Sequence, residues 1–213
     1  MNEPGAARST SPSSIRSSSN LNLEQLRGSL QFLRGFMRNP AQVGSVLPSS
    51  HRLKQRLVRS AQIADARTIV ELGPGTGGTT AAFLQAMSPR AQLLAIELDS
   101  DFHQHLRSTI TDPRFALEMG SAEHLEDFLA ARRMPAPDAI VSGIPFSTMP
   151  RELSQRVAAA IAKVLRPGGL FVAYQVRAHV AGFVSPYLGE PDKRWEMVNV
   201  PPVRVFRWIK PPL

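Results

Sequence analysis

The stretch Ile69-Val70-Glu71-Leu72-Gly73-Pro74-Gly75-Thr76-Gly77-Gly78 decides the fold of this chain. Residues 68–72 form a short β-branched and apolar run, which is typical of a buried strand. The glycines that follow predict a tight turn whose backbone a ligand can approach closely. Residues 79–87 predict a helix, whose first N–H groups point at whatever the turn holds. Strand, glycine turn and helix in this order are typical of the ligand-binding edge of an open α/β sheet.

Two acidic residues narrow the choice of ligand, because a glycine turn alone also fits the dinucleotide-binding pattern. Glu71 stands just before the first glycine, inside the end of the strand. The next predicted strand, 92–96, is followed directly by Glu97. A carboxylate about 20 residues after the turn is placed to hold ribose hydroxyls.

The segment from Glu71 to Gly77, together with the second acid, resembles the first motif of class I S-adenosylmethionine-dependent methyltransferases. The resemblance implies an α/β, Rossmann-like fold. Its sheet would have seven mostly parallel strands, with an antiparallel last strand and helices on both faces. It also implies that Glu97 holds the ribose and that Glu71 orients the cofactor amino group. The cofactor-binding residues implied in this way are Glu71, Gly73, Gly75, Thr76, Gly77, Glu97, Leu98, Ser121, Ala122 and Ser142.

The third predicted strand, 115–118, leads to a turn in which these methyltransferases usually carry an Asp that contacts the adenine amine. This chain has Ser121 at that position, which can hydrogen-bond but supplies no charge. Glu123 is a second candidate for the adenine contact. A carboxylate at a helix start is better explained by its interaction with the helix dipole.

The fourth predicted strand, 138–142, ends in Ser142-Gly143-Ile144-Pro145-Phe146. This end lies beside the first strand, at the topological switch point where ligands bind. Amine and adenine methyltransferases often have Asn-x-Pro-Tyr or Asn-x-Pro-Phe here, and Gly143 replaces the Asn. A flat nucleobase amine would therefore lose its main polar contact, although Gly143 and Pro145 are also explained as turn-shaping residues.

The rest of the chain completes the predicted sheet. A helix is predicted at 150–165 and a fifth strand at 170–176, which contains Tyr174. Arg177 and His179 follow at the carboxyl end of that strand. Arg177 can bind a substrate phosphate through two parallel hydrogen bonds, or it can be a solvated loop arginine. Further helices are predicted at 51–61 and 101–110, and the final strands 194–200 and 203–209 are predicted to form an antiparallel pair.

Composition excludes several classes of protein. The 213 residues contain no cysteine, so disulfides, thiolate metal sites and a cysteine nucleophile are excluded. No apolar run approaches the ~18 residues of a membrane-spanning helix, and no secretory signal is expected. The five histidines form no metal-binding pattern, so no metal is expected.

The net charge of +8 is concentrated near the N-terminus, where residues 1–60 hold nine basic and two acidic residues. Residues 1–20 are rich in serine and predict a disordered arm. Residues 21–38 predict an amphipathic helix, with leucines on one side and Arg27, Arg34 and Arg38 interleaved. That helix either docks on the sheet or lies in an anionic membrane surface, with its apolar side in lipid. We divide the chain into the arm, a basic helical segment at 21–60 and a cofactor-binding domain at 61–213.

A wider set of motifs resembles bacterial phospholipid N-methyltransferases of the soluble type. It comprises 32–40, Val43 to Ser50, Glu71 to Gly77, Val141 to Pro145 and Pro201-Pro202-Val203. The resemblance implies methylation of the phosphatidylethanolamine amine, to methylated derivatives and phosphatidylcholine, by a cytoplasmic enzyme held peripherally on the inner membrane. Candidate catalytic residues are Tyr174, His179, Ile144 and Pro145, and candidate substrate residues are Gly143, Phe146 and Arg177.

Two alternatives stay open. One is an rRNA adenine dimethyltransferase-like enzyme, which the basic arm permits and Gly143 argues against. Those relatives normally carry a C-terminal helical domain, for which we expect no room in this chain. The other is a small-molecule methyltransferase, or a protein that only binds the cofactor.

Overall fold

The computed structural model describes residues 50–196 and 203–212. The predicted disordered arm at 1–20 and amphipathic helix at 21–38 lie outside these residues. Among the described helices, none has the length and apolar character needed to cross a membrane.

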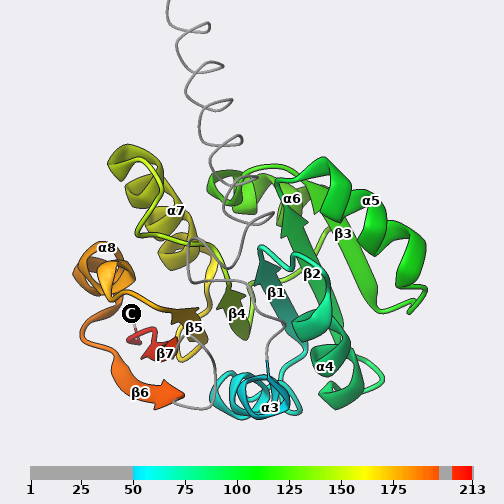
Figure 1. The fold of residues 1–213 in the computed structure, drawn as a ribbon, viewed down its shortest axis with the longest axis horizontal. Helices are drawn as coiled ribbons and strands as arrows, with labels where there is room; N and C mark the ends of the chain where they lie inside the picture. The colour runs from blue at the N-terminus through cyan, green and yellow to red at the C-terminus, as the bar shows by residue number, and fades with distance from the viewer. Residues whose placement is uncertain (1–49, 197–202, 213) are drawn as a thin grey trace, which may run out of the picture.

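A seven-stranded sheet forms the centre of the described part, with the strand order β3-β2-β1-β4-β5-β7-β6 (Figure 1). Strands β1 to β5 are parallel to one another, whereas β7 is antiparallel to both β5 and β6. The predicted Rossmann-like architecture and antiparallel last strand are therefore confirmed. The strands are β1 (Thr68–Leu72), β2 (Gln92–Glu97), β3 (Phe115–Met119), β4 (Ala139–Ser142), β5 (Leu170–Gln175), β6 (Asp192–Glu196) and β7 (Val203–Ile209).

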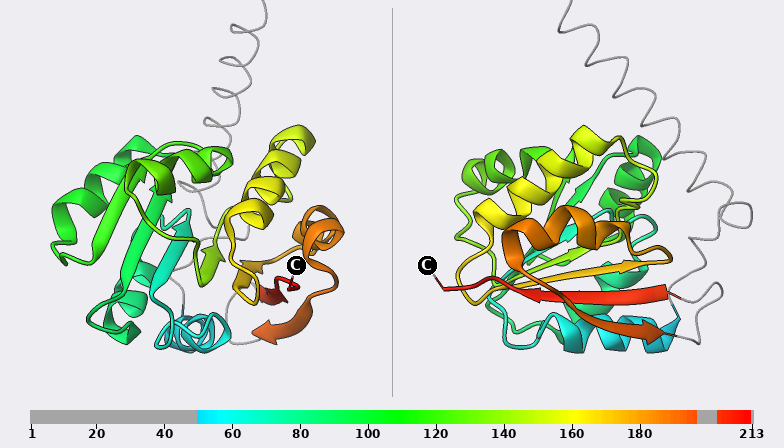
Figure 2. Two further views of the ribbon diagram at one scale, coloured as in Figure 1. Left: turned by 180° about the vertical axis from the view of Figure 1, so that it is seen from behind. Right: turned by 90° about the vertical axis from the view of Figure 1, so that its left-hand side faces the viewer.

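Helices cover both faces of this sheet, as the side view in Figure 2 shows for α7 and α8 against α3. On one face lie α3 (His51–Ser60), α4 (Gly78–Ala86) and α5 (Ser100–Thr109). On the other lie the 3-10 turn η1 (Ala122–His124), α6 (Leu125–Ala131), α7 (Arg151–Val164) and α8 (His179–Leu188).

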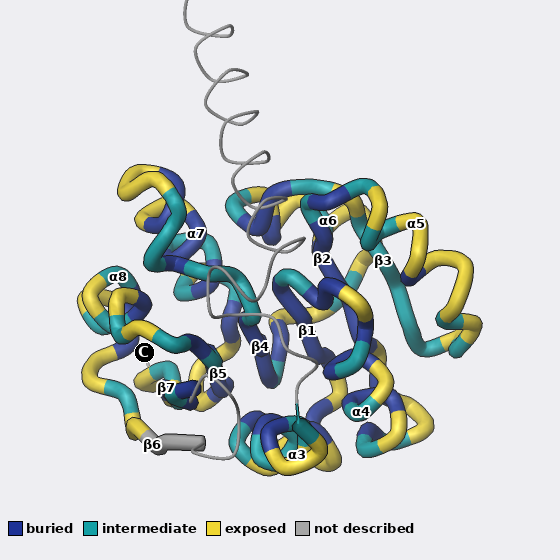
Figure 3. Tube along the Cα trace, viewed as in Figure 1, coloured by how far each residue is buried: buried dark blue, intermediate teal, exposed yellow. Residues whose placement is uncertain are grey.

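Successive side chains of the inner strands point to opposite faces of the sheet, so each layer of helices packs against its own apolar core. In β1, Ile69 packs with the α3–α4 side, and Val70 packs with the α6–α8 side. Every residue of β1 and β4 is buried, and Figure 3 shows both strands at the centre of the molecule. Strands covered on both faces are expected to be mostly apolar, which explains why the sequence 68–72, apart from Thr68 and Glu71, predicts a buried strand.

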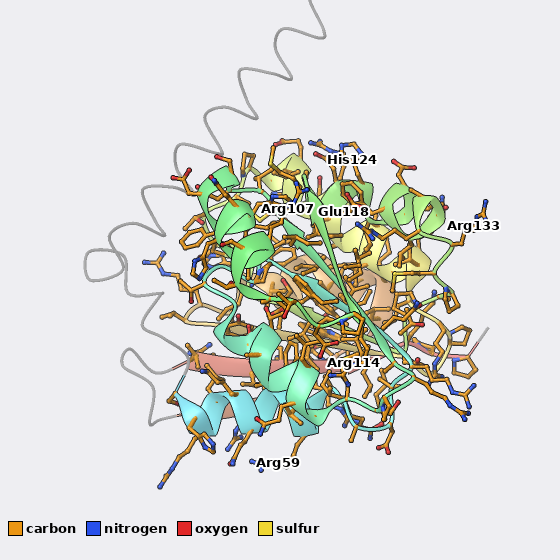
Figure 4. The ribbon with its side chains drawn as sticks, turned by 90° about the vertical axis from the view of Figure 1, so that its right-hand side faces the viewer. Arg59, Arg107, Arg114, Glu118, His124 and Arg133 are labelled. Atoms are coloured by element: carbon orange, nitrogen blue, oxygen red, sulfur yellow. The ribbon has the colours of Figure 1, made fainter. Side chains whose placement is uncertain are left out.

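Helix α3 packs onto the sheet as part of the described domain. Its N-cap residue Ser50 accepts a hydrogen bond from the Leu53 amide at 3.2 Å, as its position before the helix predicts. Leu53 and Leu57 are fully buried, four residues apart on one side of the helix. Arg59 points away from this packed side into solvent (Figure 4).

The position of α4, which carries the glycine turn at its start, is fixed at its other end by Arg114. The Arg114 guanidinium donates to the carbonyl of Leu84 at 2.7 Å and to those of Met87 and Ser88 at 3.2 and 3.3 Å. An arginine at the C-terminus of a helix satisfies carbonyls that have no partner within the helix. Arg114 also forms an ion pair with Asp112. The hydrogen bonds from Arg114 lower the pKa of the Asp112 carboxyl to about 2.

The structure adds α8, which the sequence analysis did not predict. Gly182 and Pro186 lie inside this helix and disfavour it locally. Val180, Val184 and Leu188 are nevertheless buried at four-residue spacing, and this spacing was the available signal. Strand β6 begins at Asp192, two residues before the predicted start.

Candidate active site

The candidate site lies at the carboxyl edge of the sheet, where β1 has β2 on one side and β4 on the other. This is the predicted switch point, because the chain crosses from β3 back to β4 on the far side of β1. An apolar cavity opens here, between the glycine turn and the start of α7. Its lining residues are Gly73, Ile96, Glu97, Leu98, Gly120, Ser121, Ala122, Ile144, Thr148, Met149, Leu153 and Val157.

The glycine turn follows β1 and has the backbone that its sequence predicts. Gly73, Gly75 and Gly77 all have positive φ, between 57° and 78°. Two features exclude a side chain at Gly77. Its φ is positive, and Cδ2 of Leu106 in α5 lies 2.7 Å from the position that a Cβ would occupy. Gly77 is also the N-cap of α4, so the first N–H groups of that helix face the edge. Thr76 is exposed at the tip of the turn.

Glu97 is held rigidly at the end of β2. Its side chain is 1% exposed and accepts hydrogen bonds from the backbone N–H groups of Gly75, Leu98 and Asp99 at 3.0, 2.9 and 2.9 Å. Burial raises the pKa of Glu97, and these three bonds oppose the shift. Because Glu97 bonds the glycine turn and lines the cavity, it fixes the turn to the pocket wall.

Glu71 lies beneath the turn. It is 2% exposed and accepts hydrogen bonds from the Thr79 hydroxyl and, at 2.7 Å, from the Thr80 hydroxyl. Burial raises the pKa of Glu71 to about 7, against the effect of the two hydroxyls. Glu71 is therefore close to its titration point at neutral pH, which is unusual for a carboxyl group.

The third-strand turn brings Ser121 and Ala122 into the wall of the cavity, which Ile144 and Leu153 also line. Glu123, the alternative adenine contact, instead pairs with Arg156 of α7, with Nε and Oε2 2.5 Å apart. Ser121 thus lines the pocket, whereas the Glu123 carboxylate is engaged between η1 and α7.

The loop after β4 is tied to β5 by Gln175, which the sequence analysis missed. Gln175 Nε2 donates to the Ile144 carbonyl at 2.6 Å, while its Oε1 is buried without a partner. The Ile144 amide lies 3.3 Å from Ser142 Oγ, and the Pro145 carbonyl accepts from the Thr148 amide at 3.1 Å. These bonds hold Ile144 against the cavity.

Phe146 and Tyr174 have different surroundings. The Phe146 ring is 1% exposed and packs against Phe183 of α8, with ring centroids 6.2 Å apart, so it supports the loop from behind. Tyr174 lies beside Gly143: a Cβ at Gly143 would be 2.5 Å from the phenol oxygen. Burial, and then the charge on Glu71, raises the pKa of Tyr174 above its usual value.

A shallow open groove adjoins this loop at the start of α7 and α8. It is lined by Arg151, Ala178, His179, Gly182 and Phe183. His179 is exposed at the first turn of α8, and Arg177 is exposed just before it, outside this lining. His179 and Tyr174, both candidate catalytic residues, therefore belong to different parts of the edge.

Two further features of the described residues bear on where methyl transfer could take place: their capacity to bind a metal ion and a second cavity. The residues described include no group of three or more His, Asp or Glu side chains able to hold a metal ion. A polar cavity lies beside the outer strands β6 and β7 rather than at the switch point, which separates it from the motifs above. It is lined by Arg56, Arg59, Ser60, Gln62, Asp192, Val205 and Arg207.

Comparison with known proteins decides the family. Residues 69–169 match the sequence model of a family described as a methyltransferase domain. The ornithine lipid N-methyltransferase of Singulisphaera acidiphila is 32% identical over 177 residues, which cover 82% of this chain and 92% of that protein. This chain belongs to the class I S-adenosylmethionine-dependent methyltransferases. The ribosomal RNA small subunit methyltransferase A of Synechococcus sp. (strain RCC307) is 29% identical over 137 residues, which cover 64% of this chain and 48% of that protein.

Solved structures agree on the fold of this methyltransferase. The N-methyltransferase NodS from Bradyrhizobium japonicum WM9, in complex with S-adenosyl-L-homocysteine, superposes with a TM-score of 0.65 at 15% identity. The superposition covers 86% of this chain and 99% of that one. The cofactor of this methyltransferase is S-adenosyl-L-methionine. The lining of the cavity suits the chemistry of its adenosine half, because apolar walls suit a flat base and Glu97 is an acceptor beside them.

Lys54 is a second site residue that the sequence analysis missed. Its Nζ lies 3.4 Å from the position of a Cβ at Gly78, so α3 brings an ammonium group to the first turn of α4. A lysine in a helix with no nearby motif gives no local signal of this. Only the packing of α3 against α4 reveals it.

Proposed function

We propose that this methyltransferase transfers methyl groups from S-adenosyl-L-methionine to the amine of a membrane lipid headgroup, at an anionic membrane surface. The observation that carries the proposal is the relationship to an ornithine lipid N-methyltransferase over 82% of the chain. The two lipid amines to test are those of ornithine lipid, from that relative, and of phosphatidylethanolamine, from the motifs of the sequence.

The geometry of the acceptor side supports a lipid. The groove beside the β4 loop is open, and it combines the basic side chains of Arg151 and His179 with the ring of Phe183. A cation and an apolar surface side by side suit a headgroup with an anionic group and the start of an acyl chain. Residues 21–38 lie outside the described residues. As a basic amphipathic helix they would hold the enzyme peripherally on the cytoplasmic face of the inner membrane.

The residues divide the work of binding. Glu97 would accept from the ribose hydroxyls, Ser121 and Ala122 would bound the adenine, and the first turn of α4 with Lys54 would hold the carboxylate of the methionine half. When bound, the cofactor supplies a methyl group on a positively charged sulfur. Ile144 and Tyr174 would then position the lipid amine and exclude water from it. An ammonium group must first lose a proton to expose a lone pair.

A liposome assay tests the proposal. Full-length protein and labelled S-adenosyl-L-methionine would be incubated with vesicles that contain either amine lipid, with and without an anionic lipid. We expect label in the lipid fraction only when an amine lipid is present, more of it with the anionic lipid, and less at high salt. A Glu97→Ala variant supplies the inactive control. Cofactor binding without transfer to any lipid would overturn the proposal.

An adenine acceptor is the second candidate, because ribosomal RNA methyltransferases also match the chain. Gly143 provides no side chain to bind the amine of a flat base, and a nucleic-acid role would rest on the basic N-terminal residues. Transfer of label to RNA but not to lipid, in the same assay, would favour this candidate.

A further inference from the structure

The polar cavity beside β6 and β7 has a volume of about 350 Å³ and has no role in the proposed function. It lies on the α3 face of the sheet, because Val205 packs in the core of that face and Arg207 follows it two residues later along β7. Figures 1 and 2 both show β6 next to α3. None of its described lining residues also lines the cofactor cavity or the groove at α7 and α8. The cavity is therefore a separate place on the molecule.

Three arginines surround this cavity, and they come from elements that are far apart in the sequence. Arg56 and Arg59 lie in the last two turns of α3, and Arg207 lies in β7. Asp192 is directly across from Arg207 in the β6–β7 ladder and is the one carboxylate among the described lining residues. Three positive groups and one negative group give this lining a formal charge of +2. Like charges repel one another, so such a cluster suits an anionic ligand.

The guanidinium of Arg207 has a nitrogen that the described residues leave unsatisfied. Its Nε is buried and makes no hydrogen bond with them. A buried donor without an acceptor is costly, most of all in a charged group, and such donors are rare in folded proteins. Because the Arg207 side chain lines the cavity, a turn of the guanidinium would bring this N–H to an anion bound there.

A simpler explanation for the arginines of α3 is that they satisfy the carbonyl groups at the end of that helix. Backbone amides already do this, with bonds of 2.9, 3.0 and 3.2 Å (Ala61 to Leu57, Ile63 to Val58 and Gln62 to Arg59). Gln62 then has a φ of 49°, a conformation that favours glycine at the end of a helix. Its side chain, present at that cost, also lines the cavity.

We propose that this cavity binds a phosphomonoester group, held chiefly by Arg59 and Arg207. The fork of a guanidinium matches two phosphate oxygens at once. The +2 charge of the described lining complements the charge of a phosphomonoester, which is about −1.5 to −2 near pH 7. A phosphodiester has a single ionisable oxygen and matches that charge less well. This inference does not depend on the proposed function, because it concerns a different part of the molecule and needs no methyl transfer.

The rest of the ligand should be small and polar. Ser60 and Gln62 offer a hydroxyl and an amide, and Val205 is the one apolar residue among the described lining residues. The volume lies at the lower end of the ~300–1,000 Å³ that is usual for ligand sites, so a short polar group fits beside the phosphate. A soluble organic phosphate and the headgroup of a lipid such as phosphatidate present the same chemistry.

Calorimetric titration of the full-length protein with glycerol 3-phosphate tests the site. Arg59→Gln and Arg207→Gln should each weaken binding about 10–100-fold, because each removes a charged hydrogen-bond donor. Asp192→Asn should strengthen binding a few-fold, because it removes a repelling charge. Arg52→Gln is the matched control, since Arg52 is an exposed cation one turn before Arg56 on the same side of α3 and outside the lining. Its affinity should stay within about twofold of wild type, because exposed charges are screened.

Two results of this titration would overturn the proposal. One is equal weakening by Arg52→Gln and Arg207→Gln, which would mean that a general attraction to α3 explains the binding. The other is equal affinity for the diester glycerophosphoglycerol. S-Adenosylhomocysteine should bind every variant as it binds wild type, which shows that the variants are folded. Arg207→Lys, which keeps the charge but not the fork, decides the case in which the glutamine variant fails that check, and it should still weaken binding several-fold.

Vesicle sedimentation separates the two sources of the phosphomonoester. Phosphatidylcholine vesicles would contain either phosphatidate or, at equal surface charge, phosphatidylglycerol. A lipid source predicts a preference for phosphatidate that Arg207→Gln abolishes and Arg52→Gln keeps. A soluble source predicts equal binding to both vesicles, with glycerol 3-phosphate still bound in solution. If glycerol 3-phosphate did not bind and phosphatidate were not preferred, the proposal would be overturned.

Discussion

The two halves of the sheet edge have their polar groups arranged in opposite ways. On the cofactor side, Glu97 accepts three backbone hydrogen bonds and Glu71 accepts two from side chains. On the acceptor side, the amide oxygen of Gln175 is buried without a partner, and an open groove is lined by Arg151 and His179. The hydrogen bonds on the cofactor side fix its polar groups in advance, which suits a site that always binds the same cofactor. The acceptor side has few such bonds, so a few side chains there determine which acceptor binds.

The largest expected effect is on the cofactor side, at Glu97. Glu97→Ala leaves the amides of Gly75, Leu98 and Asp99 without their acceptor and removes the ribose contact. At about 1.5–3 kcal/mol for each hydrogen bond to a charged group, S-adenosylhomocysteine affinity should fall at least ~100-fold. Isothermal titration calorimetry measures this. Glu126→Gln is the matched control, because Glu126 is exposed and, among the described residues, pairs with exposed Lys163. If Glu97→Ala bound S-adenosylhomocysteine as tightly as wild type, the hydrogen bonds of Glu97 would not distinguish the cofactor side from the acceptor side.

The second prediction concerns the pH dependence of stability. Because Glu71 has a folded-state pKa of about 7, above its ordinary value of 4.5, the folded state binds the proton more tightly. The resulting stabilisation is complete below pH 4.5 and is lost as the pH rises through 7. It amounts to roughly 3 kcal/mol at about 1.4 kcal/mol per pH unit. The raised pKa of Glu97 adds in the same direction.

Urea unfolding from pH 4.5 to 8 checks this, with Glu71→Gln as the comparison. The variant should lose most of the decline in the free energy of unfolding over that window. Asp112 and Asp138, whose pKa values are lowered, act in the opposite sense and only in more acidic solution. A wild-type stability that rises between pH 4.5 and 7 would contradict the assignment.

The third prediction tests how tightly the acceptor side is fitted at Gly143. Gly143→Ala places a methyl group against Tyr174 and should lower the free energy of unfolding by about 1–3 kcal/mol. Tyr174→Phe removes the nearest atom, so the double variant should lose less than the sum of the single losses. Gly182→Ala is the control, because outside the backbone of its own helix no atom of the described residues lies within 4 Å of its Cβ position in α8. It should gain about 0.5–1 kcal/mol. Strict additivity at 143 and 174 would mean that the two residues do not constrain each other.

The same contrast explains how far the sequence predicts this molecule. The cofactor side is built from residues that are consecutive or follow a strand, so the family motif places Glu71, the glycines and Glu97 together at this edge. Their roles in binding the cofactor stay predictions. Lys54 and Gln175 contact the site from a helix and a strand whose own sequences carry no motif. Their roles depend on packing between distant segments, as does the exclusion of a side chain at Gly143 by Tyr174. Helix α8 was missed because Gly182 and Pro186 disfavour it locally, and burial of one side overcomes that cost.

The smallest predicted effect concerns Lys54, which lies on the cofactor side of the sheet edge. The Lys54 ammonium stands at the first turn of α4, where the helix N-terminus already favours an anion. If both hold the carboxylate of the methionine half, Lys54→Met should weaken S-adenosylhomocysteine binding about 5–10-fold, the equivalent of roughly 1 kcal/mol. The methionine keeps most of the apolar stem, so packing on α4 is largely retained.

Two comparisons isolate the charge at Lys54. Methylthioadenosine, which has the adenosine and sulfur but no amino-acid carboxylate, should bind Lys54→Met and wild type alike. Arg52→Met, which removes an exposed cation from the same helix, should leave both ligands unaffected. Equal weakening of both ligands by Lys54→Met would mean that Lys54 supports α4 rather than the carboxylate. The cofactor side would then hold the methionine half through the helix N-terminus and the glycine turn alone.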